Sequence, residues 1–167
     1  MEITVKDKDL RKAAAEGADR FVEFVKDKIV EAAGGELTAE ALQRLSADQT
    51  TLWAWFILRD EVMDGGFVQL IHNGYGDFFF RNPFAKALKL WDVEHIPQLI
   101  RKGQKLYRNS KDALMRECSD EEFMALFEQY PEFDELDDNF IEYEEEATHA
   151  IARYVDAHLD LFVKVAE

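Results

Sequence analysis

Cysteine is nearly absent from the chain, because Cys118 is the only one among 167 residues. A single cysteine excludes a disulfide bond within the chain and is typical of proteins from a reducing compartment. Apolar runs are short: no segment approaches the roughly 18 apolar residues of a membrane-spanning helix, and the first residues lack the apolar core of a signal peptide. We therefore expect a cytoplasmic protein that does not bind membranes.

The motifs of common enzyme and cofactor sites are also missing. The sequence has no Gly-rich phosphate loop, no Gly-x-Ser-x-Gly and no Cys-x-x-Cys. His72, His95 and His158 have no nucleophile beside them, and Cys118 lies among acidic residues that disfavour a reactive thiolate. We expect no catalytic residue, no cofactor and no bound metal.

Basic residues are scarce in one part of the chain. Residues 112–167 contain 18 acidic and 3 basic residues, whereas residues 1–111 contain 17 of each, so the net charge of −15 comes entirely from the last third. Such a surface repels phosphates, which disfavours direct binding to nucleic acid or to anionic membranes and favours a basic protein partner. The alternative is that the acidic residues only maintain solubility.

Apolar residues recur at helical spacing along nearly the whole chain. No stretch alternates for long enough to predict a strand, and only the segment 77–80 is ambiguous. We predict an all-α fold: a single-domain multi-helix bundle with a long amphipathic, acidic C-terminal helix. The expected helices cover about 8–33, 38–45, 47–63, 67–73, a segment from Asn82-Pro83 to Trp91, 94–108, 120–130 and 134–165.

The predicted C-terminal helix carries its acidic residues opposite its apolar stripe. Leu136, Phe140 and Tyr143 lie on one side, and Asp138 and Glu142 lie on the other. An ordinary exposed face mixes lysine with glutamate, but the segment 112–146 has 15 acidic residues and one base, Arg116. Like charges four residues apart are destabilising, so we infer that this surface binds a partner.

Imitation of DNA is one way to use such a surface. A single column of carboxylates at a spacing of four residues is about 6 Å apart, several times sparser than the phosphates of duplex DNA. A mimic would therefore need several segments together, in a monomer or a homodimer. The carboxylates that we predict to bind a basic partner are Asp120, Glu121, Glu122, Glu132, Asp134, Glu135, Asp138, Glu142 and Glu145.

Two other patterns suggest local roles. The segment Asp64-Gly65-Gly66-Phe67, with Gln69 and Asn73, predicts a sharp turn between two helices in which the two amides satisfy exposed backbone groups; ligand binding is the alternative. Glu146-x-x-His149 matches half of a di-iron motif. The nearest second copy is Asp92-x-x-His95, at a helix start.

The sequence resembles a bacterial family known as domain of unknown function 4375, which includes a DNA-mimic protein. The resemblance covers about residues 47–162. The most specific part is the segment 61–74, in which an acidic residue is followed by Gly-Gly-Phe, a Gln and an Asn. Ala87-Leu88 and the helix around 99–107 are similar in placement. The segments 136–140, 144–145 and 154–158 resemble the last helix of the family. Leu70-Ile71 stands where the family usually has aromatic residues.

The resemblance implies an all-α domain over residues 46–167, preceded by an N-terminal helical extension, residues 1–45, that packs on it. It also implies an acidic protein-interaction module, in which the DNA mimic occupies the DNA-binding surface of a transcription regulator. Two alternatives remain: an immunity- or antitoxin-like inhibitor of a toxin, and a metal-binding helical protein or enzyme of unknown reaction.

Overall fold

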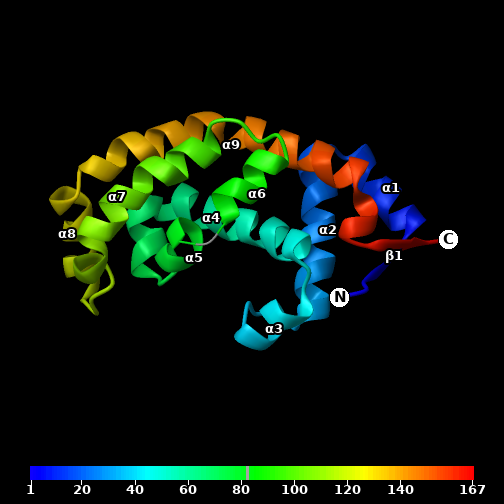
Figure 1. The fold of residues 1–167 in the computed structure, drawn as a ribbon, viewed down its shortest axis with the longest axis horizontal. Coiled ribbons are helices and arrows are strands. Elements are labelled where there is room, and N and C mark those ends of the chain that lie inside the picture. The colour runs from blue at the N-terminus through cyan, green and yellow to red at the C-terminus, as the bar shows by residue number, and fades with distance from the viewer. Residues whose placement is uncertain (82) are drawn as a thin grey trace. The chain divides into compact units, whose positions relative to one another are not determined.

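The computed structural model describes residues 1–81 and 83–167 and confirms the all-α fold class. Asn82, the first residue of the helical segment predicted to reach Trp91, lies outside the described residues. The elements are β1 (Thr4–Lys6), α1 (Asp7–Ala15), α2 (Ala18–Ala33), α3 (Ala39–Arg44), α4 (Ala47–His72), α5 (Gly76–Arg81), α6 (Phe84–Leu90), α7 (Ile96–Leu114), α8 (Asp120–Gln129), α9 (Glu132–Ala157), the 3-10 helix η1 (Leu159–Leu161) and β2 (Lys164–Ala166) (Figure 1).

The chain divides into two compact units, one formed by Met1–Phe56 with Thr148–Glu167 and the other by Ile57–Ala147. The first unit contains the parallel pair β1 and β2, with Thr4 opposite Lys164. Figure 1 shows these strands side by side near the two ends of the chain. The buried face of α2, which includes Phe21, Val22, Val25 and Ile29, supplies much of this unit's core.

A buried glutamine holds the first unit together near the strands. Gln49 is 2% exposed, and its side-chain amide donates to the carbonyls of Met1, at 2.8 Å, and Phe162, at 2.9 Å. Its Oε1 accepts the backbone N–H of Ser46 at 3.0 Å, and the Ser46 hydroxyl accepts the backbone N–H of Gln49. These reciprocal bonds form a capping box at the start of α4, and the same glutamine also connects two segments that are distant in sequence.

The second unit is built around aromatic side chains. Phe80 stacks on Tyr107 with ring centroids 5.0 Å apart, and Phe67 meets Phe140 edge to face at 6.0 Å. Phe67, Tyr107 and Phe140 are fully buried. Because these residues come from α4, α5, α7 and α9, the cluster fixes the first part of α9 within the unit.

Three predicted helices differ from the structure. The helix predicted for 94–108 begins at Ile96 and continues to Leu114. The helix predicted for 8–33 is two helices, α1 and α2. The break lies at Gly17, whose φ of +122° is incompatible with a right-handed helix. The helix predicted for 134–165 ends at Ala157, because Phe162 and Val163 are buried and Lys164 donates its N–H to the Ile3 carbonyl at 2.7 Å. The ambiguous segment 77–80 is helical, within α5.

Among residues 1–81 and 83–167, no helix combines the length and the apolar character that crossing a bilayer requires.

Candidate functional site

The nine carboxylates predicted to bind a partner lie on α8 and the first part of α9, within the second unit. All nine side chains belong to exposed residues. Within the part of the chain that the structure describes, none of them forms an ion pair with Lys or Arg. We define these nine residues as the acidic surface.

The start of α8 is fixed by a capping box. The Ser119 hydroxyl accepts the Glu122 N–H at 3.2 Å, and the Glu122 carboxylate accepts the Ser119 N–H at 3.3 Å. Asp120, Glu121 and Glu122 then form the first turn, where the helix dipole favours negative charge. The helix terminus therefore offsets part of the repulsion among these three carboxylates.

Along α9, Asp134, Asp138, Glu142 and Glu145 follow one another at spacings of four, four and three residues. This spacing places them on one side of the helix. Their neighbours on the opposite side, Phe133 and Phe140, are buried, at 1% and 0% exposure. The acidic surface is therefore the outer face of a packed helix, as the apolar stripe predicts.

Asp137 is the exception to this pattern, and the sequence analysis did not select it. Its Oδ1 accepts the backbone N–H of Phe67 at 2.8 Å. The pKa of the carboxyl is raised from 3.8 to about 6, mainly by burial; the Phe67 N–H opposes the shift, and the nearby charges of Asp134 and Asp138 contribute to it. The signal was present in the sequence, because Asp137 falls near the apolar stripe of α9.

The Gly-Gly turn forms the other half of this contact. Gly65 and Gly66 have non-helical backbone angles inside α4, and Gly66 has φ +71° and ψ −176°, a conformation found almost only in glycine. A Cβ added to Gly66 would lie 2.4 Å from Asp137 Oδ2. The predicted sharp turn is therefore present, and it brings the Phe67 N–H to the α9 carboxylate.

Gln69 and Asn73 bind carboxylates instead of the backbone groups that we expected. The Gln69 amide donates to Glu61 at 3.0 Å and to Asp64 at 2.9 Å, and the Asn73 amide donates to Glu61 at 2.8 Å. Two acidic side chains are thus held together beside the turn by neutral amides, which leaves their negative charge in place.

Two exposed apolar side chains interrupt the acidic helices. Met124 on α8 is 65% exposed and Ile141 on α9 is 52% exposed. Apolar side chains surrounded by charge are typical of contact points in protein interfaces.

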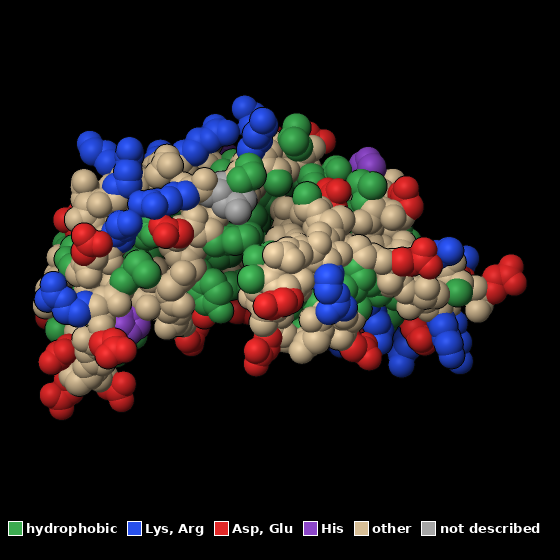
Figure 2. Space-filling model, turned by 60° about the horizontal axis from the view of Figure 1, so that its bottom comes forward, with side chains coloured by type: hydrophobic (Ala, Val, Ile, Leu, Met, Phe, Trp, Pro, Cys, Tyr) green, Lys and Arg blue, Asp and Glu red, His purple; other side chains and the backbone are tan. Residues whose placement is uncertain are grey.

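The second unit also has a basic face, which the zero net charge of residues 1–111 as a whole does not reveal. Residues 81–111 contain 8 bases and 2 acids. Figure 2 shows Lys and Arg side chains gathered along the upper left of the view, and Asp and Glu at the lower left tip. We define the basic face by residues on α5, α6 and α7: Arg81, Lys86, Lys89, Arg101, Lys102, Lys105, Arg108 and Lys111.

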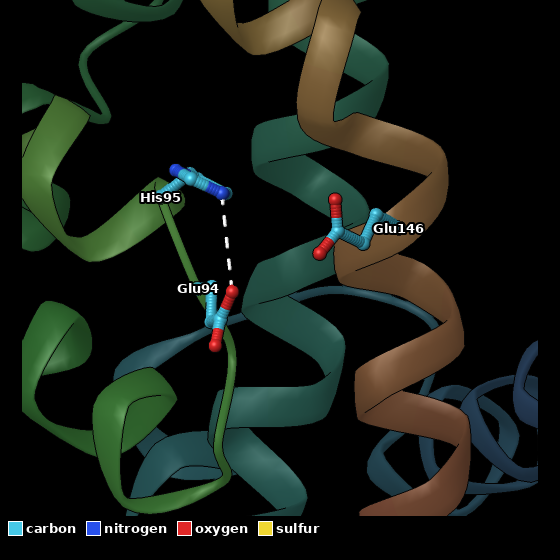
Figure 3. Close-up of side chains that lie close together, drawn as sticks. All are labelled: Glu94, His95 and Glu146. Carbon is cyan, nitrogen blue, oxygen red and sulfur yellow. Dashed lines mark ion pairs between the residues drawn. The ribbon is translucent and has the colours of Figure 1, made fainter.

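The Glu146-x-x-His149 pair does not converge on one site. His149 Nε2 lies 3.6 Å from Asp19 Oδ1 on α2. Glu146 instead faces Glu94 and His95 (Figure 3). The predicted half-motif is therefore split between different neighbours.

Comparison with known proteins places these features in a family. The family model described as DMP19-like protein matches residues 43–158. A curated relative, the DNA mimic protein DMP19 of Neisseria meningitidis serogroup B (strain ATCC BAA-335 / MC58), is 34% identical over 129 residues, covering 77% of this chain and 78% of the relative. The matched range includes the acidic surface and the Gly-Gly turn.

Proposed function

The chain belongs to the DMP19-like protein family, and from that premise we propose that its acidic surface occupies the DNA-binding surface of a basic partner, such as a transcription regulator. The observation that carries the proposal is the row of exposed carboxylates on α8 and α9, which form no ion pair with Lys or Arg of residues 1–81 and 83–167. The name of the curated relative, a DNA mimic protein, supports the same function. On this proposal the chain acts by binding and not by catalysis.

The physical basis is replacement of phosphates by carboxylates. Each Lys or Arg that contacts a phosphate of DNA can instead form a charge-assisted hydrogen bond with a carboxylate of the acidic surface. Because the carboxylates are held on packed helices, little backbone conformational entropy is lost when the partner binds. Met124 and Ile141 add apolar contacts that DNA lacks.

The test compares two variants of equal net charge. The first neutralises the α9 column as D134N/D138N/E142Q/E145Q. The control, E36Q/E40Q/D156N/D160N, removes four exposed carboxylates outside the acidic surface. Both variants and the wild type are immobilised, exposed to an extract of the source cell, and washed with duplex DNA or with increasing salt, and the captured proteins are identified by mass spectrometry.

We expect the wild type and the control to capture a DNA-binding protein that duplex DNA displaces, and the α9 variant to lose it. Binding should weaken steeply with salt. Equal capture by the two variants would refute the assignment to this surface. Capture of a toxin that duplex DNA does not displace would instead support the inhibitor alternative.

A further inference from the structure

A histidine and two glutamates that are far apart in sequence meet in the second unit. Glu94 and His95 lie at the junction between α6 and α7, and Glu146 lies on α9. One ligand atom from each lies within 4.8 Å of the others, and His95 Nε2 is 3.9 Å from Glu94 Oε2. Figure 3 shows the His95 ring and both carboxylates facing a common space.

The backbone at this junction is strained. His95 has φ +67° and ψ −51°, and the Ile96 N–H donates to the Glu94 carbonyl at 2.7 Å. This is a γ-turn with positive φ at its centre, which is rare and costs free energy for any residue other than glycine. The result is that consecutive side chains, Glu94 and His95, both face α9.

The His95 ring is held in place by α9 itself. It stacks on Tyr143 with ring centroids 3.9 Å apart and planes inclined by 13°. Tyr143 and Glu146 are three residues apart and therefore share a face of the helix. The ring is thus oriented with Nε2 toward the carboxylates before any ligand arrives.

Apart from His95, the two glutamates have no basic partner among the described residues. Over residues 1–81 and 83–167, neither Glu94 nor Glu146 forms an ion pair with Lys or Arg. Two carboxylates close together repel each other, and a divalent cation between them removes that repulsion.

We propose that Glu94, His95 and Glu146 bind a divalent transition-metal ion, with Zn²⁺ and Mn²⁺ as the chemically matched candidates. One imidazole nitrogen and two carboxylate oxygens are a donor set that suits these ions. Bonds of about 2.0–2.2 Å require the three ligand atoms to be roughly 3.3–3.6 Å apart. The exposed Glu94 and Glu146 side chains reach that spacing by rotation about their side-chain bonds.

Water has access to the remaining coordination positions. Glu94 and His95 also line a hollow of about 450 Å³. The bound ion would connect the α6–α7 junction to the helix that carries most of the acidic surface, and it would add positive charge next to that surface. The metal site does not depend on the proposed function, because its ligands are outside the nine carboxylates.

The experiment titrates the chelator-treated full chain with Zn²⁺, Mn²⁺ and Mg²⁺ by calorimetry, and follows the melting temperature in parallel. The site variants are His95→Ala and Glu146→Gln. The controls are His149→Ala, which tests the Glu146-x-x-His149 pair, and Asp156→Asn, an exposed acid on the same helix. Circular dichroism shows whether each variant is folded.

We expect one Zn²⁺ or Mn²⁺ per chain, weaker binding of Mg²⁺, and a melting temperature that rises with ion concentration. Each site variant should bind at least about tenfold more weakly, while both controls bind as the wild type does. Should His95→Ala fail to fold, Glu146→Gln still tests the proposal. The Glu146 side chain is exposed, so its replacement should not disturb the fold. No binding by the wild type, or equal binding by the Glu146→Gln variant, would overturn the proposal.

Discussion

Gly66 is the residue on which the contact between α4 and Asp137 depends. Its backbone has positive φ, and the space beyond its Cα is filled by a carboxylate. Gly74 also has positive φ, +89°, but no atom lies within 4 Å of a Cβ placed there. A side chain at Gly66 would therefore meet a steric clash that a side chain at Gly74 would not.

Gly66→Ala should destabilise the fold much more than Gly74→Ala. Gly74→Ala should lose about 1–2 kcal/mol for positive φ in a residue with a Cβ. Gly66→Ala should lose about 1–3 kcal/mol for its glycine-only backbone conformation and about a further 1–3 kcal/mol for overpacking. Urea denaturation of both variants measures the free energies of unfolding. Equal losses would show that Asp137 moves away without cost.

Asp137 should make stability depend on pH between about 4 and 6. Its folded pKa of about 6 lies above the ordinary value of 3.8, so its contribution is fully present below the unfolded pKa and is lost as pH rises through the folded one. Relative to the Asp137→Asn variant, the wild type should lose about 1–3 kcal/mol of unfolding free energy from pH 4 to pH 7.

Urea denaturation of the wild type and the Asp137→Asn variant at several pH values measures this difference. The contributions of most other titrating groups to the pH dependence are the same in both proteins and cancel in the comparison. A difference that instead grows in favour of the wild type with rising pH would mean that the Phe67 N–H outweighs burial and stabilises the carboxylate.

At the scale of elements, the capping box decides how well α8 presents its three carboxylates. Ser119→Ala should cost about 1 kcal/mol and should speed hydrogen exchange of the amides in 120–129. Thr38→Ala is the matched control, because Thr38 caps α3 in the first unit by accepting the Ala41 N–H at 3.1 Å. Exchange mass spectrometry should show each effect confined to its own helix; faster exchange throughout the second unit in Ser119→Ala would contradict this.

Helices and their exposed faces could be predicted because their signals are local. The stripe containing Leu136 and Phe140 and the capping residue Ser119 identify α8 and α9 within short windows of sequence. The early end of α9 could not be predicted in this way. It depends on strand pairing between residues that are 160 apart, such as Thr4 and Lys164.

The candidate sites follow the same division. The exposure of the acidic surface was a local prediction, and the structure has all nine residues exposed. The proximity of His95 and Glu146 depends on the packing of segments about 50 residues apart, so it cannot be predicted from the spacing of residues along the sequence. The bases of the basic face are concentrated in residues 81–111, but acidic residues elsewhere in 1–111 balance their charge. The division into an N-terminal extension, residues 1–45, and a domain, residues 46–167, stays a prediction. The two compact units of the structure have different boundaries.

At the scale of the whole molecule, the basic face should limit how a basic partner approaches. Lys and Arg on α7 repel such a partner, while the acidic surface attracts it. The variant R101Q/K105Q/R108Q neutralises three exposed residues that, over the described residues, form no ion pair. Surface plasmon resonance with a captured partner should show faster association, by a few-fold, at low salt. Slower association would mean that these cations contact the partner directly.

The basic face also has a practical consequence in the purification of the protein. A molecule with a net charge of −15 should bind an anion exchanger and pass through a cation exchanger. Retention on a resin depends on the local patch that faces it, and the segment 81–111 presents 8 bases with only 2 acids. At low conductivity near neutral pH, we expect the wild type to be retained on both resins and R101Q/K105Q/R108Q to flow through the cation exchanger. The net charge calculated from composition accounts for retention on the anion exchanger but not for retention on the cation exchanger.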